Sequence, residues 1–340
     1  MKLVSVFSTA INSIFPIMLL ILFGFLLRRK GFLSDEFVRI GNRLAFHYLL
    51  PTKLFLNAYK IEKFSDIPWR LALFALVMMT VIFALGCITT PLATKYPKRK
   101  GVLLQSTFRS NTAIIGISLA GILGGEQAAT VSAILTAICL PLMNILGVVS
   151  LSMYIRSEGE RKGVKQLLRD VVTNPLIIGI VLGFGCLLIR SLEEKVFGRV
   201  VFSLSGNLSF FYSALTQLGS IASPFALVVL GGQFSFSEAG NMHREILVGT
   251  VWRNVIAPII ALGSAYLLST YTGLLTCTPA DYPALIALFA TPVAVSSAVM
   301  AGQMGSDGQL ATQLVVWTSI ASVVTMFAII CVMIWTGLLV

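Results

Sequence analysis

The chain has 340 residues, of which 56% are hydrophobic and only 11% are charged, whereas charged residues make up about 25% of an ordinary soluble domain. Its net charge of +11 comes from short clusters between apolar runs, such as Arg28-Arg29-Lys30 and Lys98-Arg99-Lys100, with no aromatic interleaving or nucleic-acid motif. The composition therefore excludes a soluble domain and a nucleic-acid partner, and it predicts a protein of the lipid bilayer.

Taken in chain order, ten apolar segments are long enough for a membrane helix, which needs about 20 residues. The first is too long for a signal peptide, has no A-x-A cleavage site and stops at Arg28. We therefore predict an all-α polytopic membrane protein with ten transmembrane helices. The predicted spans are 7–27, 38–57, 69–92, 101–124, 127–154, 172–190, 209–233, 246–270, 283–304 and 308–338.

Basic residues predict the orientation of these spans. Of the 25 lysines and arginines, 15 lie in or beside the loops that follow odd-numbered spans. Another 7 lie in or beside the N-terminus and the loops that follow even-numbered spans. Because cytoplasmic loops carry the excess of positive charge, both termini are predicted outside, in the periplasm, and the protein in the cell inner (plasma) membrane.

Two matches predict an internal repeat. FRSNTAIIGISLAGILGGE (108–126) aligns with FATPVAVSSAVMAGQMGSD (289–307) at an offset of 181, and PIMLLILFGF (16–25) with PLIIGIVLGF (175–184) at an offset of 159. Pro51 and Pro224 also fall midway along spans 2 and 7. Halves of five spans must have opposite orientations, as in many secondary transporters. We predict a first repeat at 1–155, a cytoplasmic loop at 156–171 and an inverted repeat at 172–340.

Polar residues predict that spans 4 and 9 are interrupted and cross. Pro292 lacks an N–H group, and Asn111 and its neighbours offer hydrogen bonds that compete with a helix. Interrupted helices would direct N–H groups and positive helix ends at one point, which favours a small organic anion. The predicted substrate-binding residues are Arg109, Ser110, Asn111, Thr112, Thr291, Pro292, Ser296 and Ser297. Kink stabilisation and helix packing are the alternatives for the uncharged members.

Three cations, Lys53, Arg109 and Arg253, lie inside predicted spans, whereas all 14 acids lie in loops or at span ends. Snorkelling toward the headgroups is the alternative to anion binding for Arg109 and the preferred explanation for the other two. His47 is the only group within a span that titrates near neutral pH. It is a possible proton-coupling residue, with a hydrogen-bonded structural role as the alternative.

At these residues the sequence resembles the auxin efflux carrier family, including its shorter bacterial members. The resemblance rests on NTAIIGISLAG (111–121), NPLIIGIVLG (174–183), ASPFALVVLGGQF (222–234) and TPVAVSSAVMAGQMGSD (291–307), in the family's order. Ser118 stands where the family usually has a proline, so the interruption of span 4 must depend on Asn111, Gly116 and their neighbours.

The resemblance implies a sodium/proton antiporter-like crossover fold. Spans 1, 2, 6 and 7 would form a scaffold, and spans 3–5 and 8–10 a moving transport domain. It also implies a substrate site at the crossing of spans 4 and 9, and substrates such as auxin-like, malate-like or malonate-like acids. The expected function is secondary active transport or uniport of organic anions by alternating access.

Other functions have less support in the sequence. An anion channel remains an alternative. With two histidines, single scattered cysteines and neither H-E-x-x-H nor G-x-S-x-G, we expect no enzyme, metal or cofactor. A sensor would need an output domain, for which the loops leave no room. Gly179-x-x-x-Gly183 resembles a helix-packing motif and suggests a possible homodimer.

Overall fold

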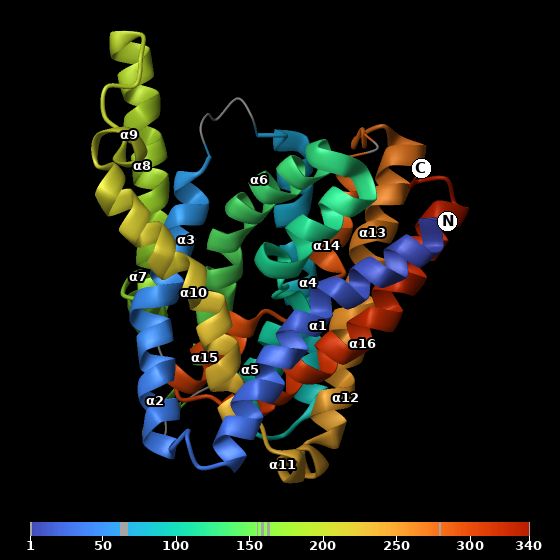
Figure 1. Cartoon of the computed structure of the whole chain (residues 1–340). Coiled ribbons are helices and arrows are strands. Elements are labelled where there is room, and N and C mark those ends of the chain that lie inside the picture. The colour runs from blue at the N-terminus through green and yellow to red at the C-terminus, as the bar shows by residue number, and fades with distance from the viewer. Residues whose placement is uncertain are drawn as a thin grey trace.

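The computed structural model describes residues 2–61, 67–154, 156–157, 160–161, 164–278 and 280–339, and it is almost entirely helical (Figure 1). The first half contains α1 (Lys2–Arg29), α2 (Asp35–Leu44), the π-helix η1 (Ala45–Leu49), α3 (Leu50–Tyr59), α4 (Trp69–Ala93), α5 (Pro97–Phe108), the π-helix η3 (Thr112–Gly116) and α6 (Ile117–Ser152).

The second half continues with α8 (Pro175–Phe197), α9 (Leu204–Asn207), α10 (Ser209–Gln233), α11 (Phe236–Asn241), α12 (His243–Val251), the π-helix η4 (Trp252–Ile256), α13 (Ala257–Leu267), the π-helix η5 (Leu268–Thr272), α14 (Asp281–Phe289), α15 (Val295–Gln303) and α16 (Gly308–Trp335). The short strands β1 (Arg156–Ser157) and β2 (Glu160–Arg161), an antiparallel pair, and α7 (Val164–Val172) occupy the predicted loop. Residues 158–159 and 162–163 of that loop lie outside the described residues.

Six helical segments of the described chain are long and apolar enough to cross a membrane: Trp69–Ala93, Thr112–Ser152, Pro175–Phe197, Ser209–Gln233, His243–Thr272 and Gly308–Trp335. The prediction of an all-helical, multi-pass membrane protein is confirmed at this level. Thr112–Ser152 runs through two predicted spans, and it turns at Gly124–Gly125, where Gly125 has a φ of +74° that suits glycine. The count of ten spans stays a prediction.

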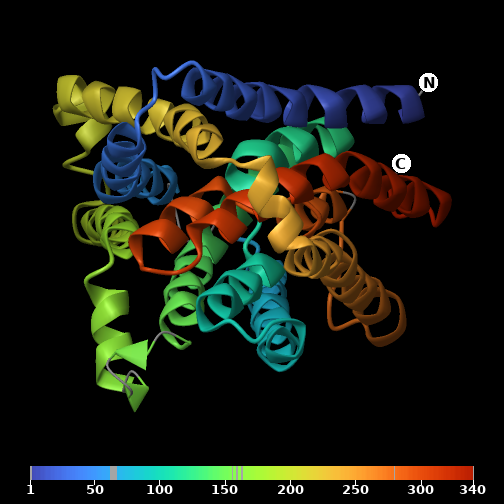
Figure 2. The same cartoon turned by 90° about the horizontal axis from the view of Figure 1, so that it is seen from below.

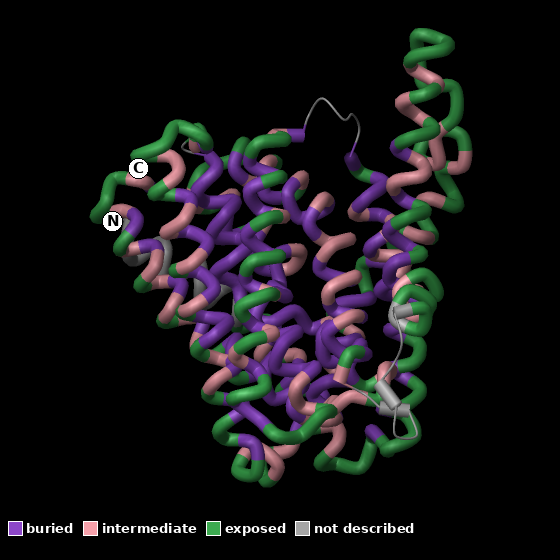
Figure 3. The backbone as a smooth tube through the Cα atoms, turned by 180° about the vertical axis from the view of Figure 1, so that it is seen from behind, coloured by how far each residue is buried: buried purple, intermediate pink, exposed green. Residues whose placement is uncertain are grey.

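The helices pack in two groups. In one, α1 packs against α10 and α3 against α8. The helix α1 lies along the outside of the molecule (Figure 2) and also packs on α16 of the other group. In the other, α4, α5, α6, α12, α13, α14 and α16 pack together, with buried residues concentrated in the middle (Figure 3). The half-helix α15 packs on α16 but also contacts α10 and η1, so it lies at the boundary between the groups.

Glycines allow close approach within the first group. A Cβ added at Gly24 of α1 would lie 2.0 Å from the Val228 carbonyl oxygen of α10, and one at Gly183 of α8 would lie 2.6 Å from the Phe55 carbonyl oxygen of α3. Gly179 approaches α3 in the same way. The Gly179-x-x-x-Gly183 motif therefore packs inside the chain, and it gives no support to a homodimer through this face.

Candidate functional site

Both predicted helix interruptions are confirmed. The helix α5 ends at Phe108 and is followed by extended backbone at Arg109, before helical structure resumes in η3. The helix α14 ends at Phe289, and the backbone is again extended at Ala294, just before α15. Ser118 lies inside α6, beyond the interruption. The end of α5 therefore does not depend on a proline at position 118.

The two interruptions pair with each other. The Asn111 N–H donates to the Pro292 carbonyl at 2.8 Å, and the Ala294 N–H donates to the Arg109 carbonyl at 3.2 Å. Ser110 and Val293 lie between them as an antiparallel β-bridge. This short ladder satisfies backbone groups that the broken helices release, which apolar surroundings require.

The predicted polar residues around this pairing are buried, except for the half-buried Ser296, but their hydrogen bonds differ. Ser110 and Thr112 bond to each other through their hydroxyls at 2.8 Å, and the Thr291 hydroxyl donates to the Ala287 carbonyl at 3.0 Å. Such local bonds match the kink-stabilising alternative. In contrast, Asn111 Nδ2 and Ser297 Oγ have no hydrogen-bond partner within the described residues. Both atoms are buried, and their hydrogen-bonding capacity is unused within the described residues.

Arg109 is 3% exposed and lies between α6 and α15, so the snorkelling alternative is wrong for this residue. Its Nη2 donates to Asn144 Oδ1 at 2.8 Å and to Ser296 Oγ at 3.1 Å, and its Nη1 lies 3.0 Å from Met300 Sδ. Glycine at position 147 makes room, because a Cβ there would lie 2.6 Å from Nη1. Within the described residues, Arg109 forms no salt bridge.

Arg253 of η4 was expected to snorkel, and this prediction is wrong. The residue is 0% exposed, and its guanidinium donates to the backbone carbonyls of Thr107, Leu288, Phe289 and Thr291, next to both interruptions. It binds carbonyl groups at the ends of α5 and α14, which lie far from it in sequence. Lys53, the third cation, is half-buried and donates to Ser223 Oγ of α10.

Asn144 of α6 is a further polar residue beside Arg109 that the sequence prediction missed. Its side chain is 1% exposed and also donates from Nδ2 to the Leu140 carbonyl at 2.8 Å, which orients Oδ1 toward Arg109. Its presence in an apolar segment was a usable signal, because polar residues inside membrane helices are usually functional.

The hydrogen bond of His47 involves none of the residues described above. Its ring is exposed, and Nδ1 lies 3.0 Å from the Arg43 carbonyl of the preceding turn. The ring lines a groove of about 500 Å³ with residues of α3, α8 and α10, including Pro51 and Gly179. This bond matches the structural alternative, and the proton-coupling role stays a prediction.

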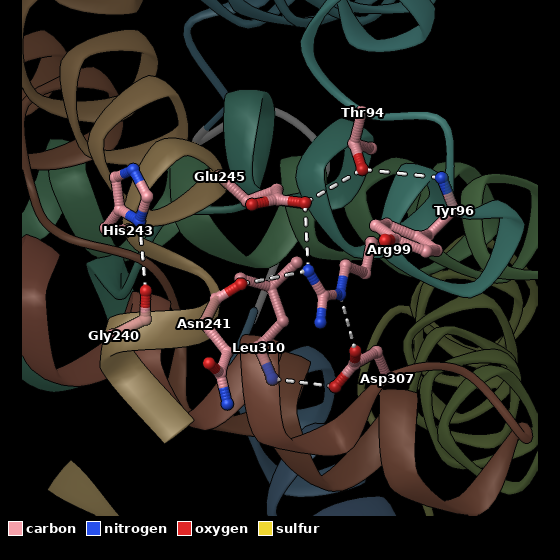
Figure 4. Close-up of polar contacts among 9 residues, drawn as sticks. All are labelled: Thr94, Tyr96, Arg99, Gly240, Asn241, His243, Glu245, Asp307 and Leu310. Carbon is pink, nitrogen blue, oxygen red and sulfur yellow. Dashed lines mark hydrogen bonds and ion pairs between the residues drawn. The ribbon is translucent and has the colours of Figure 1, made fainter. Parts of the chain in front are cut away.

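A network of ion pairs and hydrogen bonds around Arg99, called the polar brace below, fixes the start of α5 (Figure 4). It lies at the end of the molecule where α11 lies (Figure 1). Arg99 donates to Glu245 at 3.0 Å and to Asp307 at 3.2 Å, and Thr94 donates to the same Glu245 oxygen. Burial lowers the pKa of Arg99, but the hydrogen bonds and charges of Glu245 and Asp307 outweigh it and raise the pKa above its ordinary value. The brace links α5, α12 and α16.

Comparison with known proteins agrees with this architecture. The family model described as membrane transport protein matches residues 9–330. The chain belongs to this family. It is the auxin efflux carrier family that the sequence resembles.

Two proteins described as transporters are similar to this chain over most of its length. An uncharacterized transporter of Methanothermobacter thermautotrophicus is 21% identical over 335 residues, which cover 94% of this chain and 97% of the relative. An uncharacterized transporter of Methanocaldococcus jannaschii is 24% identical over 251 residues, which cover 72% of this chain and 75% of the relative. The chain is therefore a multi-pass membrane protein of a transporter family.

Proposed function

We propose that this protein is a secondary transporter that moves small organic anions, mono- or dicarboxylates, across the membrane by alternating access. The substrate binds where the two interrupted helices meet. The observation that carries this proposal is the burial of Arg109 beside that meeting point, among neutral acceptors and without a salt bridge within the described residues.

The chemistry of the surrounding groups favours an anion. A buried charge without a partner costs several kcal/mol, and a carboxylate substrate would supply the partner that the described chain lacks. Asn111 Nδ2 and Ser297 Oγ add hydrogen-bonding capacity. The first N–H groups of η3 and α15 add donors and positive helix ends. Charge-assisted hydrogen bonds to a carboxylate are stronger than neutral ones.

Internal symmetry supports the inverted repeat, and with it alternating access. Asn111 and Pro292, which align at the offset of 181, are paired with each other in the structure. Gly24 and Gly183 align at the offset of 159, and each packs on a carbonyl four residues after a proline, Val228 after Pro224 and Phe55 after Pro51. Equivalent residues therefore make equivalent contacts in the two halves.

The packing suggests which parts move. The half-helix α15 carries Ser296 and Ser297 and lies between the two helix groups, so a displacement of one group against the other would change access to the site. The two ends of the chain lie near each other (Figure 1), which agrees with an even number of spans and with termini on the same side of the membrane. Membership of a transporter family favours transport over catalysis.

The test begins with a thermal-shift screen of purified protein against mono- and dicarboxylates between about pH 5 and pH 8, since a ligand that binds only the folded state raises its stability. The best ligand is then used, radiolabelled, for uptake into proteoliposomes. We expect Asn111→Ala to reduce binding and uptake by roughly tenfold or more, as for one lost hydrogen bond to a charge. Pro292→Ala should also reduce both, because it restores a backbone N–H and favours a continuous helix where the interruption now lies.

Asn207→Ala is the matched control, because Asn207 is an exposed asparagine at the end of α9 whose side chain accepts from the Ser203 N–H at 2.8 Å, within its own helical turn. It should leave uptake unchanged. Stable Asn111→Ala and Pro292→Ala proteins that bind and move the substrate as well as the wild type would refute the proposed site. Single-channel currents would instead favour the alternative of an anion channel.

A further inference from the structure

We propose that Arg253 is a positioning residue that makes the meeting point of the interrupted helices selective for anions by binding the carbonyl ends of both helices. The inference rests on the proposed function and deepens it. Arg253 does not contact the substrate in this scheme, because its side chain is completely buried and donates to backbone carbonyls.

The geometry of Arg253 spans both interruptions. Its Nη1 donates to the Thr107 carbonyl at 3.3 Å, in the last turn of α5. Its Nη2 donates to the carbonyls of Leu288 and Phe289, the last two residues of α14, and its Nε to the Thr291 carbonyl at 2.9 Å. One side chain therefore joins two helix ends that are otherwise linked by the short backbone ladder.

The charges at the meeting point explain why such a residue is needed. Two helices end there, α5 and α14, and two helical segments begin there, η3 and α15. Each helix end carries about half an elementary charge, negative at a C-terminus and positive at an N-terminus. A substrate carboxylate would meet both signs, and the attraction and repulsion would largely cancel.

A guanidinium on the carbonyl ends removes this cancellation. The two negative ends together carry about one elementary charge, which the single positive charge of Arg253 offsets. The positive ends of η3 and α15 then act on an anion without opposition, next to Arg109. The two arginines thus have different roles: Arg253 neutralises the helix ends, whereas Arg109 donates to neutral side chains and has no salt bridge within the described residues.

Arginine suits this position better than lysine. Its planar guanidinium has five N–H donors in a fixed arrangement, so it can serve carbonyls on two helices, whereas an ammonium group has three donors at one point. Lysine would preserve the charge but could not hold all four carbonyls. The two properties, charge and bridging, can therefore be separated by substitution.

The test compares Arg253→Lys, Arg253→Met and the control Arg190→Met. Arg190 donates to the carbonyls of Tyr59 at 2.6 Å and Ile61 at 2.9 Å, at the end of α3, so it makes the same kind of contact in the other helix group. The probes are radiolabelled benzoate and malonate in proteoliposomes, and amide hydrogen exchange of peptides covering 104–116 and 286–297 without substrate.

We expect Arg253→Met to raise the KM for anion uptake by roughly tenfold or more, with a smaller change in maximal rate. Arg253→Lys should restore most of the affinity, and both variants should speed exchange in the two peptides. Arg190→Met should lower thermal stability and leave the KM unchanged. An unaltered KM in Arg253→Met, or unaltered exchange in both Arg253 variants, would overturn the inference.

The two proposals can fail separately. A wild-type protein that neither binds nor moves any carboxylate refutes the proposed function, whatever the exchange data show. A wild-type protein that transports benzoate or malonate, combined with an Arg253→Met protein of normal KM, refutes the role of Arg253 alone. If Arg253→Met does not fold, Arg253→Lys decides the matter, because unaltered exchange in its two peptides contradicts the bridging role.

Discussion

Replacing Gly147 by alanine perturbs the proposed anion site without removing any of its polar groups. The added Cβ would lie 2.6 Å from Arg109 Nη1 and 3.1 Å from Gln105 Nε2, closer than atoms normally approach. The guanidinium is the end of a flexible side chain, so it can move away, but this movement weakens its bonds to Asn144 and Ser296. The fold should survive, while the cation is displaced.

The expected size of the effect follows from the hydrogen bonds that the displaced guanidinium could no longer make to a substrate. A hydrogen bond to a charged group contributes about 1.5–3 kcal/mol, which corresponds to roughly 10- to 150-fold in affinity. We therefore expect Gly147→Ala to raise the KM for carboxylate uptake into proteoliposomes by at least about tenfold, with little change in thermal stability.

Gly185→Ala is the control, because a Cβ at this helical glycine would have no neighbour within 4 Å among the described residues. It should leave the KM unchanged. A Gly147→Ala protein with wild-type KM, and with normal folding, would refute the idea that the position of Arg109 matters for the substrate.

Three further substitutions test the surrounding structure. Gly183→Val should destabilise the protein by about 1–3 kcal/mol, measured by denaturant titration, because its Cβ would lie 2.6 Å from the Phe55 carbonyl oxygen; unchanged stability would contradict this packing. Glu245→Gln should lower the melting temperature by weakening the brace on Arg99, and no change would mean that the brace is dispensable. His47→Gln should leave any pH dependence of uptake unchanged, because the ring contacts the Arg43 carbonyl of its own helix and not the meeting point of the interrupted helices; a lost dependence would contradict the structural role.

The helix interruptions were predictable because their causes are local. Pro292 and the polar run at Ser110, Asn111 and Thr112 disfavour a continuous helix wherever they stand in the fold. The repeat then indicated that the two interruptions belong together. Their direct pairing through Asn111 and Pro292 follows the same symmetry.

The role of Arg253 could not be predicted in the same way. Its partners are backbone carbonyls, which every residue has. Along the chain, Leu288 lies 35 positions from Arg253 and Thr107 lies 146 positions from it. The Gly179-x-x-x-Gly183 motif has the same limitation, because a stripe of small residues predicts close packing without naming the partner helix. Here the partner is α3 of the same chain.

The central claim is that an anion binds where the interrupted helices meet, beside Arg109. The most direct measurement is an experimental density map of the protein with bromobenzoate or another carboxylate that the uptake assay selects. We predict density for the carboxylate within hydrogen-bond distance of the Arg109 guanidinium or Asn111 Nδ2. A transported carboxylate found only elsewhere, for example in the groove beside His47, would contradict the proposed site.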